Sequence, residues 1–147
     1  MPERARLSPK DAFPFVDLAL TRLQQKSPGG AIAPAETAVQ LAPNSAEAHY
    51  ALGRVYLEMK RVDQAVAELE TAARLAPASP EVHFSLARAY TKQNRPEKAE
   101  AERAIFARLN ALAEQQRSGR GNQAYGASHE KDTLSSVQKQ AVPSNQK

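Results

Sequence analysis

Hydrophobic and polar positions follow nearly the same order in two consecutive segments, residues 45–78 and 79–112. When the segments are aligned at an offset of 34, thirteen positions carry the same residue. Identity at this level indicates an internal repeat, in which each copy is one supersecondary unit. The fold is therefore expected to be a stack of such units.

Each copy has the apolar spacing of two amphipathic helices. The first helix of the first copy is predicted over about residues 46–59, because its apolar side chains share one helical face. These side chains are Ala48, Leu52, Val55 and Tyr56. A second helix is predicted from Asp63, whose charge suits a helix N-terminus, to just before Pro77.

The second copy repeats this pattern and then departs from it. Pro96 is placed at the start of its second helix. Further on, Ile105, Leu109 and Leu112 continue an apolar stripe, which predicts that this helix runs to about Gln116. A longer final helix with a charged outer face is typical of the end of a repeat stack.

A weaker unit precedes the two copies. Its end resembles the end of the next unit, with Pro43 and Pro77 again 34 residues apart. Its first helix is expected to bury one apolar face, made by Phe15, Leu18, Ala19 and Leu23. The segment Ser27-Pro28-Gly29-Gly30 is predicted to stop that helix. Pro34 is then predicted to lie in the first turn of a second helix that starts late.

The two ends of the chain lack this periodicity. Residues 1–10 are predicted to be a disordered lead-in. Residues 118–147 are rich in Gly, Ser, Gln and Asn and cannot bury enough apolar surface to offset their ordering entropy, so this tail is predicted to be disordered. Between them, the sequence predicts a degenerate first unit at 11–44, a full unit at 45–78 and a unit with an extended capping helix at 79–117.

The repeat resembles the tetratricopeptide repeat. The positions that define this family are filled by His49, Leu52, Gly53, Tyr56, Ala65, Leu69, Ala72 and Pro77. The second copy follows the family as far as Ala99 and departs from it at Arg103. The Ala- and Arg-rich composition is similar to that of bacterial members. The resemblance implies an all-α fold, a right-handed α-solenoid of antiparallel helix pairs with about six helices and a disordered C-terminal tail.

The resemblance also implies a binding function, because in this family the first helices of the units line a concave groove for a partner segment. In this chain the groove would carry Glu47, Tyr50, Arg54, Leu57 and Glu58 from one unit, and Glu81, Phe84, Arg88 and Lys92 from the next. Arg54 and Arg88 would suit a carboxylate, so a protein or peptide with an acidic or C-terminal segment is expected; alternatively, both arginines pair with neighbouring glutamates. The family's Lys and Asn clamp for a chaperone tail is not matched, because Tyr50 and Arg54 occupy those places.

Composition adds little chemistry to this picture. The chain has no cysteine, which excludes disulfides and thiolate metal sites. No phosphate-binding loop, zinc-protease motif or nucleophile elbow occurs. His49 and His83 repeat at a packing position and have no acidic pair at ligand spacing. No enzyme activity, cofactor, metal or small-molecule substrate is therefore expected.

Charge and hydropathy place few further limits. The net charge of +4 is spread along the chain, which does not favour nucleic-acid binding. No apolar run is long enough for a membrane span. No cleavage site follows the apolar segment near the N-terminus, so a signal peptide is not expected. The default expectation is a cytoplasmic protein, or a periplasmic or secreted one if the chain is a fragment.

Two other functions stay open. The chain could be the C-terminal structural or capping part of a longer repeat protein that orients another domain. The segment from Arg117 to Gly121 is faintly similar to arginine–glycine nucleic-acid tails, so weak nucleic-acid binding through the tail is a further alternative. The sequence does not indicate the oligomeric state.

Overall fold

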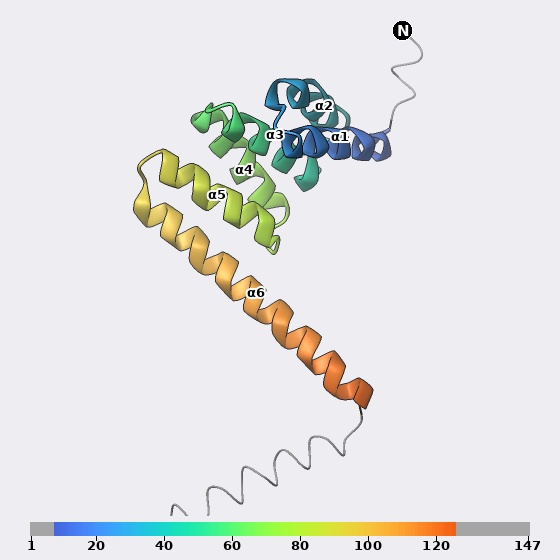
Figure 1. The fold of residues 1–147 in the computed structure, drawn as a ribbon, viewed down its shortest axis with the longest axis vertical. Coiled ribbons are helices and arrows are strands. Elements are labelled where there is room, and N and C mark those ends of the chain that lie inside the picture. The colour runs from blue at the N-terminus through green and yellow to red at the C-terminus, as the bar shows by residue number, and fades with distance from the viewer. Residues whose placement is uncertain (1–7, 126–147) are drawn as a thin grey trace, which may run out of the picture. The chain divides into compact units, whose positions relative to one another are not determined.

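The computed structural model describes residues 8–125, which form a short 3₁₀ turn, Pro9–Asp11, followed by six α-helices. The helices are α1 (Ala12–Gln24), α2 (Pro28–Leu41), α3 (Ala46–Glu58), α4 (Val62–Leu75), α5 (Pro80–Lys92) and α6 (Pro96–Tyr125). The first five helices and α6 as far as Leu109 belong to one compact unit (Figure 1). The expected all-α fold of stacked helix pairs is confirmed.

The backbone repeats every 34 residues from the first helix onward. The first helices of the three pairs begin at Ala12, Ala46 and Pro80, and their partners begin at Pro28, Val62 and Pro96. The segment that is degenerate in sequence thus has the same helix register as the two clear copies.

The turn inside each pair repeats as well. Lys26, Lys60 and Asn94 have φ angles of 59°, 65° and 60°, in the left-handed region. In the central pair, the Arg61 N–H donates to the Tyr56 carbonyl at 2.8 Å, and the other two turns make the equivalent bond. This is the pattern of a Schellman C-cap, which satisfies carbonyls that the end of a helix leaves free. One turn geometry therefore closes all three pairs.

The start of α2 differs from the sequence prediction. This helix begins at Pro28 and includes Gly29 and Gly30, so Pro34 lies in its interior rather than in its first turn. Pro34 has no N–H to donate to the Gly30 carbonyl four residues earlier. The Arg22 guanidinium donates to that carbonyl instead, with Nη1 2.6 Å from the oxygen. A side chain of α1 thus replaces the missing helical bond, and for this reason the helix can start early.

The core runs through all the pairs and is built mainly from small side chains. Leu69, Leu86 and Val55 are its largest fully buried members. At Gly53, an added Cβ would lie 2.7 Å from Cγ of Leu69, so the absence of a side chain allows α3 and α4 to approach closely. On α1 the buried side chains are Ala12, Val16, Ala19 and Leu23. The expected burial of Leu18 is wrong, because this residue is 39% exposed.

The last helix is longer than predicted. α6 continues to Tyr125 instead of ending near Gln116, so residues 118–125 of the segment predicted to be a disordered tail are helical. The remainder of that tail, and residues 1–7 of the predicted lead-in, lie outside the described residues. Residues 110–125 belong to a second unit, in which Arg117 forms an ion pair with Glu114.

Candidate functional site

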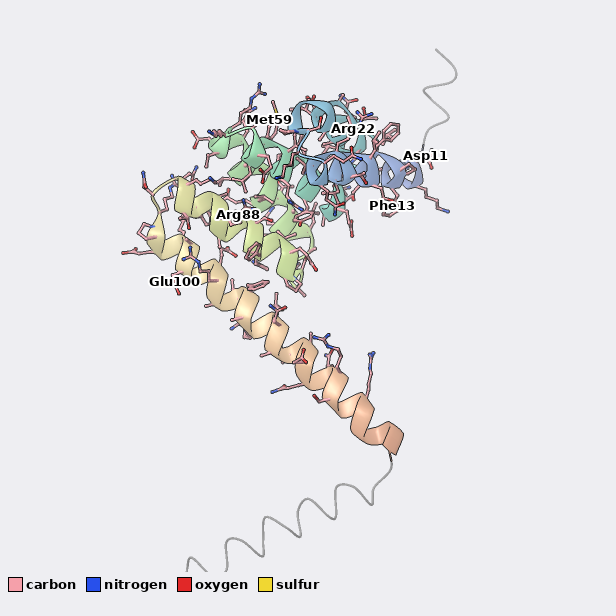
Figure 2. All side chains as sticks on the ribbon, viewed as in Figure 1. Asp11, Phe13, Arg22, Met59, Arg88 and Glu100 are labelled. Carbon is pink, nitrogen blue, oxygen red and sulfur yellow. The ribbon has the colours of Figure 1, made fainter. Side chains whose placement is uncertain are left out.

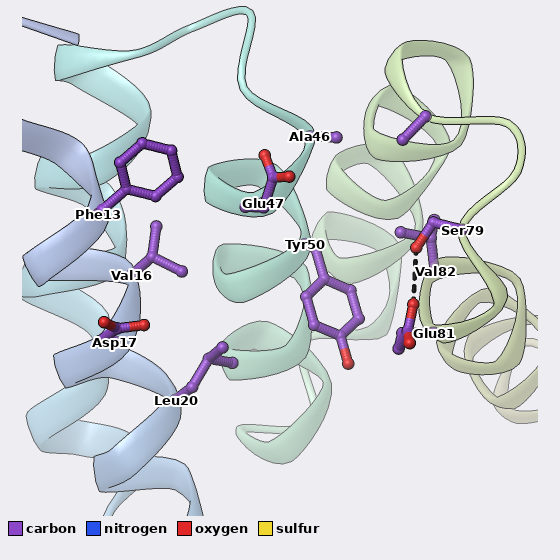
Figure 3. Close-up of a pocket in the computed structure, with 11 residues that line it drawn as sticks. Phe13, Val16, Asp17, Leu20, Ala46, Glu47, Tyr50, Ser79, Glu81 and Val82 are labelled. Atoms are coloured by element: carbon purple, nitrogen blue, oxygen red, sulfur yellow. Dashed lines mark hydrogen bonds between the residues drawn. The ribbon is translucent and has the colours of Figure 1, made fainter. Parts of the chain in front are cut away.

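A solvent-open cavity of about 340 Å³ lies between α1, α3 and α5, the first helices of the three pairs. Its walls come from Phe13, Val16, Asp17 and Leu20 of α1, Ala46, Glu47 and Tyr50 of α3, Ala76 and Ser79 of the α4–α5 connection, and Glu81 and Val82 of α5 (Figure 3). The three helices stand next to one another because α3 contacts both α1 and α5. The stacking that builds the core therefore also forms this groove.

The lining of this cavity is largely apolar and aromatic. Val16 and Val82 are buried core residues that form its base, and Leu20 is half-buried. Phe13 is 57% exposed near the N-terminal end of α1 (Figure 2). Tyr50 projects from α3 into the space between α1 and α5 (Figure 3). An exposed phenyl ring and a phenol beside an apolar base are suited to the side chain of a partner.

All charged residues among the described residues that line this cavity are acidic. Asp17, Glu47 and Glu81 come from α1, α3 and α5 respectively, and each is exposed. Glu81 accepts a hydrogen bond from the Ser79 hydroxyl at 2.9 Å, and Glu47 accepts one from Ser45 at 3.1 Å. These bonds hold the carboxylates at the rim without neutralising them. The cavity therefore has a negative rim.

The structure divides the residues predicted for the groove into three groups. Glu47, Tyr50 and Glu81 line the cavity. The residues that lie on α3 and α5 outside its lining are Arg54, Glu58, Phe84, Arg88 and Lys92. Leu57 is different, since it is only 3% exposed and packs in the core with Leu69 and Leu86. Its prediction as a groove residue is a mistake that has a physical reason: at this place the helix turns its side chain toward α4 and α5.

Several of the outer residues already have partners within the chain. Arg88 forms an ion pair with Glu58, with 3.6 Å between Nη2 and Oε1. The Arg54 guanidinium lies over the Tyr50 ring, 5.8 Å from its centroid. Phe84 packs against Phe106 of α6, with ring centroids 5.3 Å apart, yet it remains 49% exposed. The alternative that these arginines serve neighbouring side chains therefore describes Arg88 well.

The α1 wall of the cavity was missed by sequence reasoning. Phe13 and Val16 occupy the same places in the 34-residue register as Glu47 and Tyr50. Extending the repeat alignment to residue 12 would have found them. The interrupted glycine–proline segment after α1 hid that register.

A second cleft adjoins the cavity at the N-terminal end of α1. Its volume is about 520 Å³, and it shares Phe13, Ala46, Glu47 and Ala76 with the first cavity. It adds Leu75, which is 41% exposed, and Lys10. The apolar surface around Phe13 is therefore continuous between the two hollows.

The repeated histidines hold the helix pairs together. His49 Nε2 lies 2.7 Å from the Pro43 carbonyl oxygen, and its Nδ1 lies 3.3 Å from Glu68 Oε2. His83 makes the equivalent contacts with Pro77 at 2.7 Å and Glu102 at 2.5 Å. Each ring thus ties a loop carbonyl to the following helix. No group of three potential metal-ligating side chains, and no helix long and apolar enough to cross a membrane, occurs among residues 8–125.

Comparison with protein families decides the classification. The sequence profile of the tetratricopeptide repeat matches residues 22–83 and 64–118, which together cover more than half of the chain. The chain belongs to the tetratricopeptide repeat family. This family is generally a non-catalytic protein-interaction fold. None of the curated protein sequences matches the chain.

Solved structures of tetratricopeptide proteins share the fold. The second such domain of Spaghetti (RPAP3), bound to the HSP90 peptide SRMEEVD, superposes with a TM-score of 0.65 at 14% identity over 69% of this chain and 94% of that one. MamA gives 0.63 at 21% identity, over 74% of this chain and 63% of MamA. YrrB, a tetratricopeptide protein with an unusual peptide-binding site, gives 0.61 at 18% over 67% and 50%. This chain therefore spans between half and two thirds of the length of MamA and YrrB.

Proposed function

We propose that this protein is a non-catalytic interaction module whose groove between α1, α3 and α5 binds a segment of a partner protein. The observation that carries the proposal is the open cavity of about 340 Å³, where Phe13 and Tyr50 flank an apolar base. Aromatic side chains around a pocket are the residues that most often dominate a protein interface. Two structural neighbours support this reading, since one is bound to a peptide and the other has a peptide-binding site.

The proposed groove extends along α5 beyond the cavity. Phe84 is exposed there although it packs on Phe106, and it continues the row that Tyr50 begins. Arg54, Arg88 and Lys92 lie on the same helices toward their C-terminal ends. We assign these residues to an outer part of the groove and the cavity to its centre. Binding of a partner would release Arg88 from Glu58 only if the partner offered a better acceptor.

The test compares a groove variant with a surface variant on an array of immobilised random peptides. Phe13→Ser/Tyr50→Ala should weaken wild-type binders about tenfold or more, because truncation of a central aromatic residue costs about 1–2 kcal/mol or more at an interface. Leu18→Ser is the matched control, because Leu18 is an exposed apolar residue of α1 outside the cavity. Circular dichroism must show equal helicity in all three proteins.

Two outcomes decide the proposal. Binding that is lost in the double variant and retained in the control supports the cavity as the centre of the site. Peptide binding of equal strength in wild type, double variant and control would overturn it. Phe84→Ala then defines the extent of the groove, since a loss there places the outer part in contact with the partner.

A further inference from the structure

We infer that the cavity between α1, α3 and α5 takes an apolar side chain of a positively charged segment, one that carries Lys or Arg beside its anchor. This inference rests on the proposed function and deepens it by assigning the chemistry of the partner. It differs from the expectation that Arg54 and Arg88 select an acidic segment. The choice between the two follows from where the charges lie and what they already contact.

The carboxylates surround the cavity on three sides. Asp17, Glu47 and Glu81 come from three different helices and lie on its rim (Figure 3). Among the described residues that line it there is neither Lys nor Arg. A cleft lined by one sign of charge over apolar walls raises the local concentration of the opposite charge. A cationic segment would therefore be attracted, whereas an acidic one would meet three like charges.

Helix capping explains only part of this acidic rim. Glu47 and Glu81 lie in the first turns of α3 and α5, where a negative charge is stabilised by the helix dipole. Asp17 lies in the sixth position of α1, beyond the first turn. The structure gives its exposed carboxylate no hydrogen bond or ion pair among the described residues. Asp17 thus has no structural role of this kind, and it points the rim toward a cationic ligand.

The positive residues of the groove are less available than they looked in the sequence. Arg88 pairs with Glu58 at 3.6 Å, and the Arg54 guanidinium lies against the face of Tyr50. An acidic segment would have to displace the first of these contacts. The cavity itself offers the apolar contact, through Val16, Leu20 and Val82. Together these features favour an apolar anchor that enters the cavity, with its cationic neighbours at the rim.

The test reads the composition of peptides that bind, again with an array of immobilised random 12-residue peptides. The wild-type protein is compared with Asp17→Asn/Glu47→Gln/Glu81→Gln, which neutralises the rim and keeps the shapes of the side chains. The matched control is Glu36→Gln/Glu97→Gln/Glu100→Gln, which makes the same charge change at exposed positions outside the cavity. Helicity and thermal melting verify that the variants are folded.

We expect the strongest groove-dependent peptides to be enriched in Lys and Arg next to Leu, Ile or Phe, and depleted in Asp and Glu. Their binding should weaken as salt rises. It should weaken about twofold to fivefold for each neutralised carboxylate, and so about tenfold or more in the rim variant, with little change in the control. The enrichment should disappear in the rim variant.

Each other outcome has a distinct meaning. Groove-dependent peptides that are rich in Asp and Glu, and that are lost with Arg54→Gln/Arg88→Gln, would overturn this inference and leave the proposed function intact. Groove-dependent peptides with no charge preference would also overturn it. If peptides bind equally to the wild type and to Phe13→Ser/Tyr50→Ala, the proposed function fails, and this inference fails with it.

Discussion

The first helix pair, α1 and α2, and the central pair, α3 and α4, have the same backbone but different packing chemistry. Their helices begin and end at positions 34 residues apart, and both pairs close through a lysine with positive φ, Lys26 or Lys60. Yet the side chains that carry the family pattern are present only in the central pair. The comparison shows that the turn and the stacking preserve the fold where the sequence pattern has been lost.

Three equivalent contacts show how the first pair compensates. Where Gly53 faces Leu69, the register places Ala19 and Ala35, so two small residues replace a glycine and a leucine. The register puts Phe15 and Pro34 at the positions of His49 and Glu68, so apolar residues stand in place of the polar clasp. In the third contact, Arg22 stands at the position of a tyrosine, Tyr56 or Tyr90, in the other pairs.

That third position performs a different task in each pair. Tyr90 donates its hydroxyl hydrogen to Glu70 at 2.6 Å, and burial together with this bond raises the pKa of its phenol well above the usual range. Burial also raises the pKa of Tyr56, and the nearby Glu36 and Glu68 carboxylates raise it further. Both phenols therefore stay neutral at ordinary pH. Arg22 instead reaches the Gly30 carbonyl, which a tyrosine hydroxyl has no reason to do when the second helix lacks an internal proline.

The largest expected difference between the two pairs is at Leu52 and its counterpart Leu18. Leu52→Ala should lower the free energy of unfolding by about 2–5 kcal/mol, because it leaves a cavity in the core. Leu52 is 5% exposed, whereas Leu18 is 39% exposed. Leu18→Ala should therefore cost less than about 1 kcal/mol. Urea unfolding followed by circular dichroism measures both, and equal losses would contradict the assignment of Leu18 to the surface.

A smaller effect is expected where α3 and α4 approach most closely. Gly53→Ala introduces a Cβ 2.7 Å from Cγ of the fully buried Leu69, so a side chain or a helix must move. Overpacking of this kind costs about 1–3 kcal/mol, although alanine is the better helix former by about 1 kcal/mol. The net loss of stability should be about 1 kcal/mol.

The double variant Gly53→Ala/Leu69→Ala reproduces the Ala19 and Ala35 pair of the first unit. Leu69→Ala removes the atoms that the new methyl group would meet, so the double variant should be more stable than the sum of the single effects allows. Strict additivity in the same urea experiment would show that the methyl group finds space without Leu69 moving. The close approach would then have no energetic consequence.

The helices and their stacking were predictable because they depend on local patterns. The apolar stripe, the N-cap at Ser45 and the prolines that bound helices act within a few residues, and each is visible in the sequence. The early start of α2 was not predictable in this way, since it depends on Arg22, which is contributed by another helix. Propensity alone places Pro34 at a helix start, and a tertiary contact overrides it.

The candidate site was only half predictable for a related reason. Glu47, Tyr50 and Glu81 followed from the repeat, because equivalent positions of stacked units face the same side. Whether a neighbour covers a residue depends on packing between units. Leu57 is covered and Phe13 is not, and this distinction decided which residues line the cavity. The sign of its charge also emerged only when three helices were brought together.

The smallest of the three effects tests why α2 tolerates its proline. Arg22→Met keeps most of the side-chain length but removes the donor to the Gly30 carbonyl, which should cost about 1 kcal/mol for a half-exposed hydrogen bond. Pro34→Ala restores a backbone N–H that can donate to the same carbonyl. In the Pro34→Ala background, Arg22→Met should therefore cost much less. A double-mutant cycle by urea unfolding gives this coupling directly. Equal costs of Arg22→Met in both backgrounds would mean that the arginine stabilises the pair by packing alone, and that the carbonyl freed by Pro34 is satisfied by water.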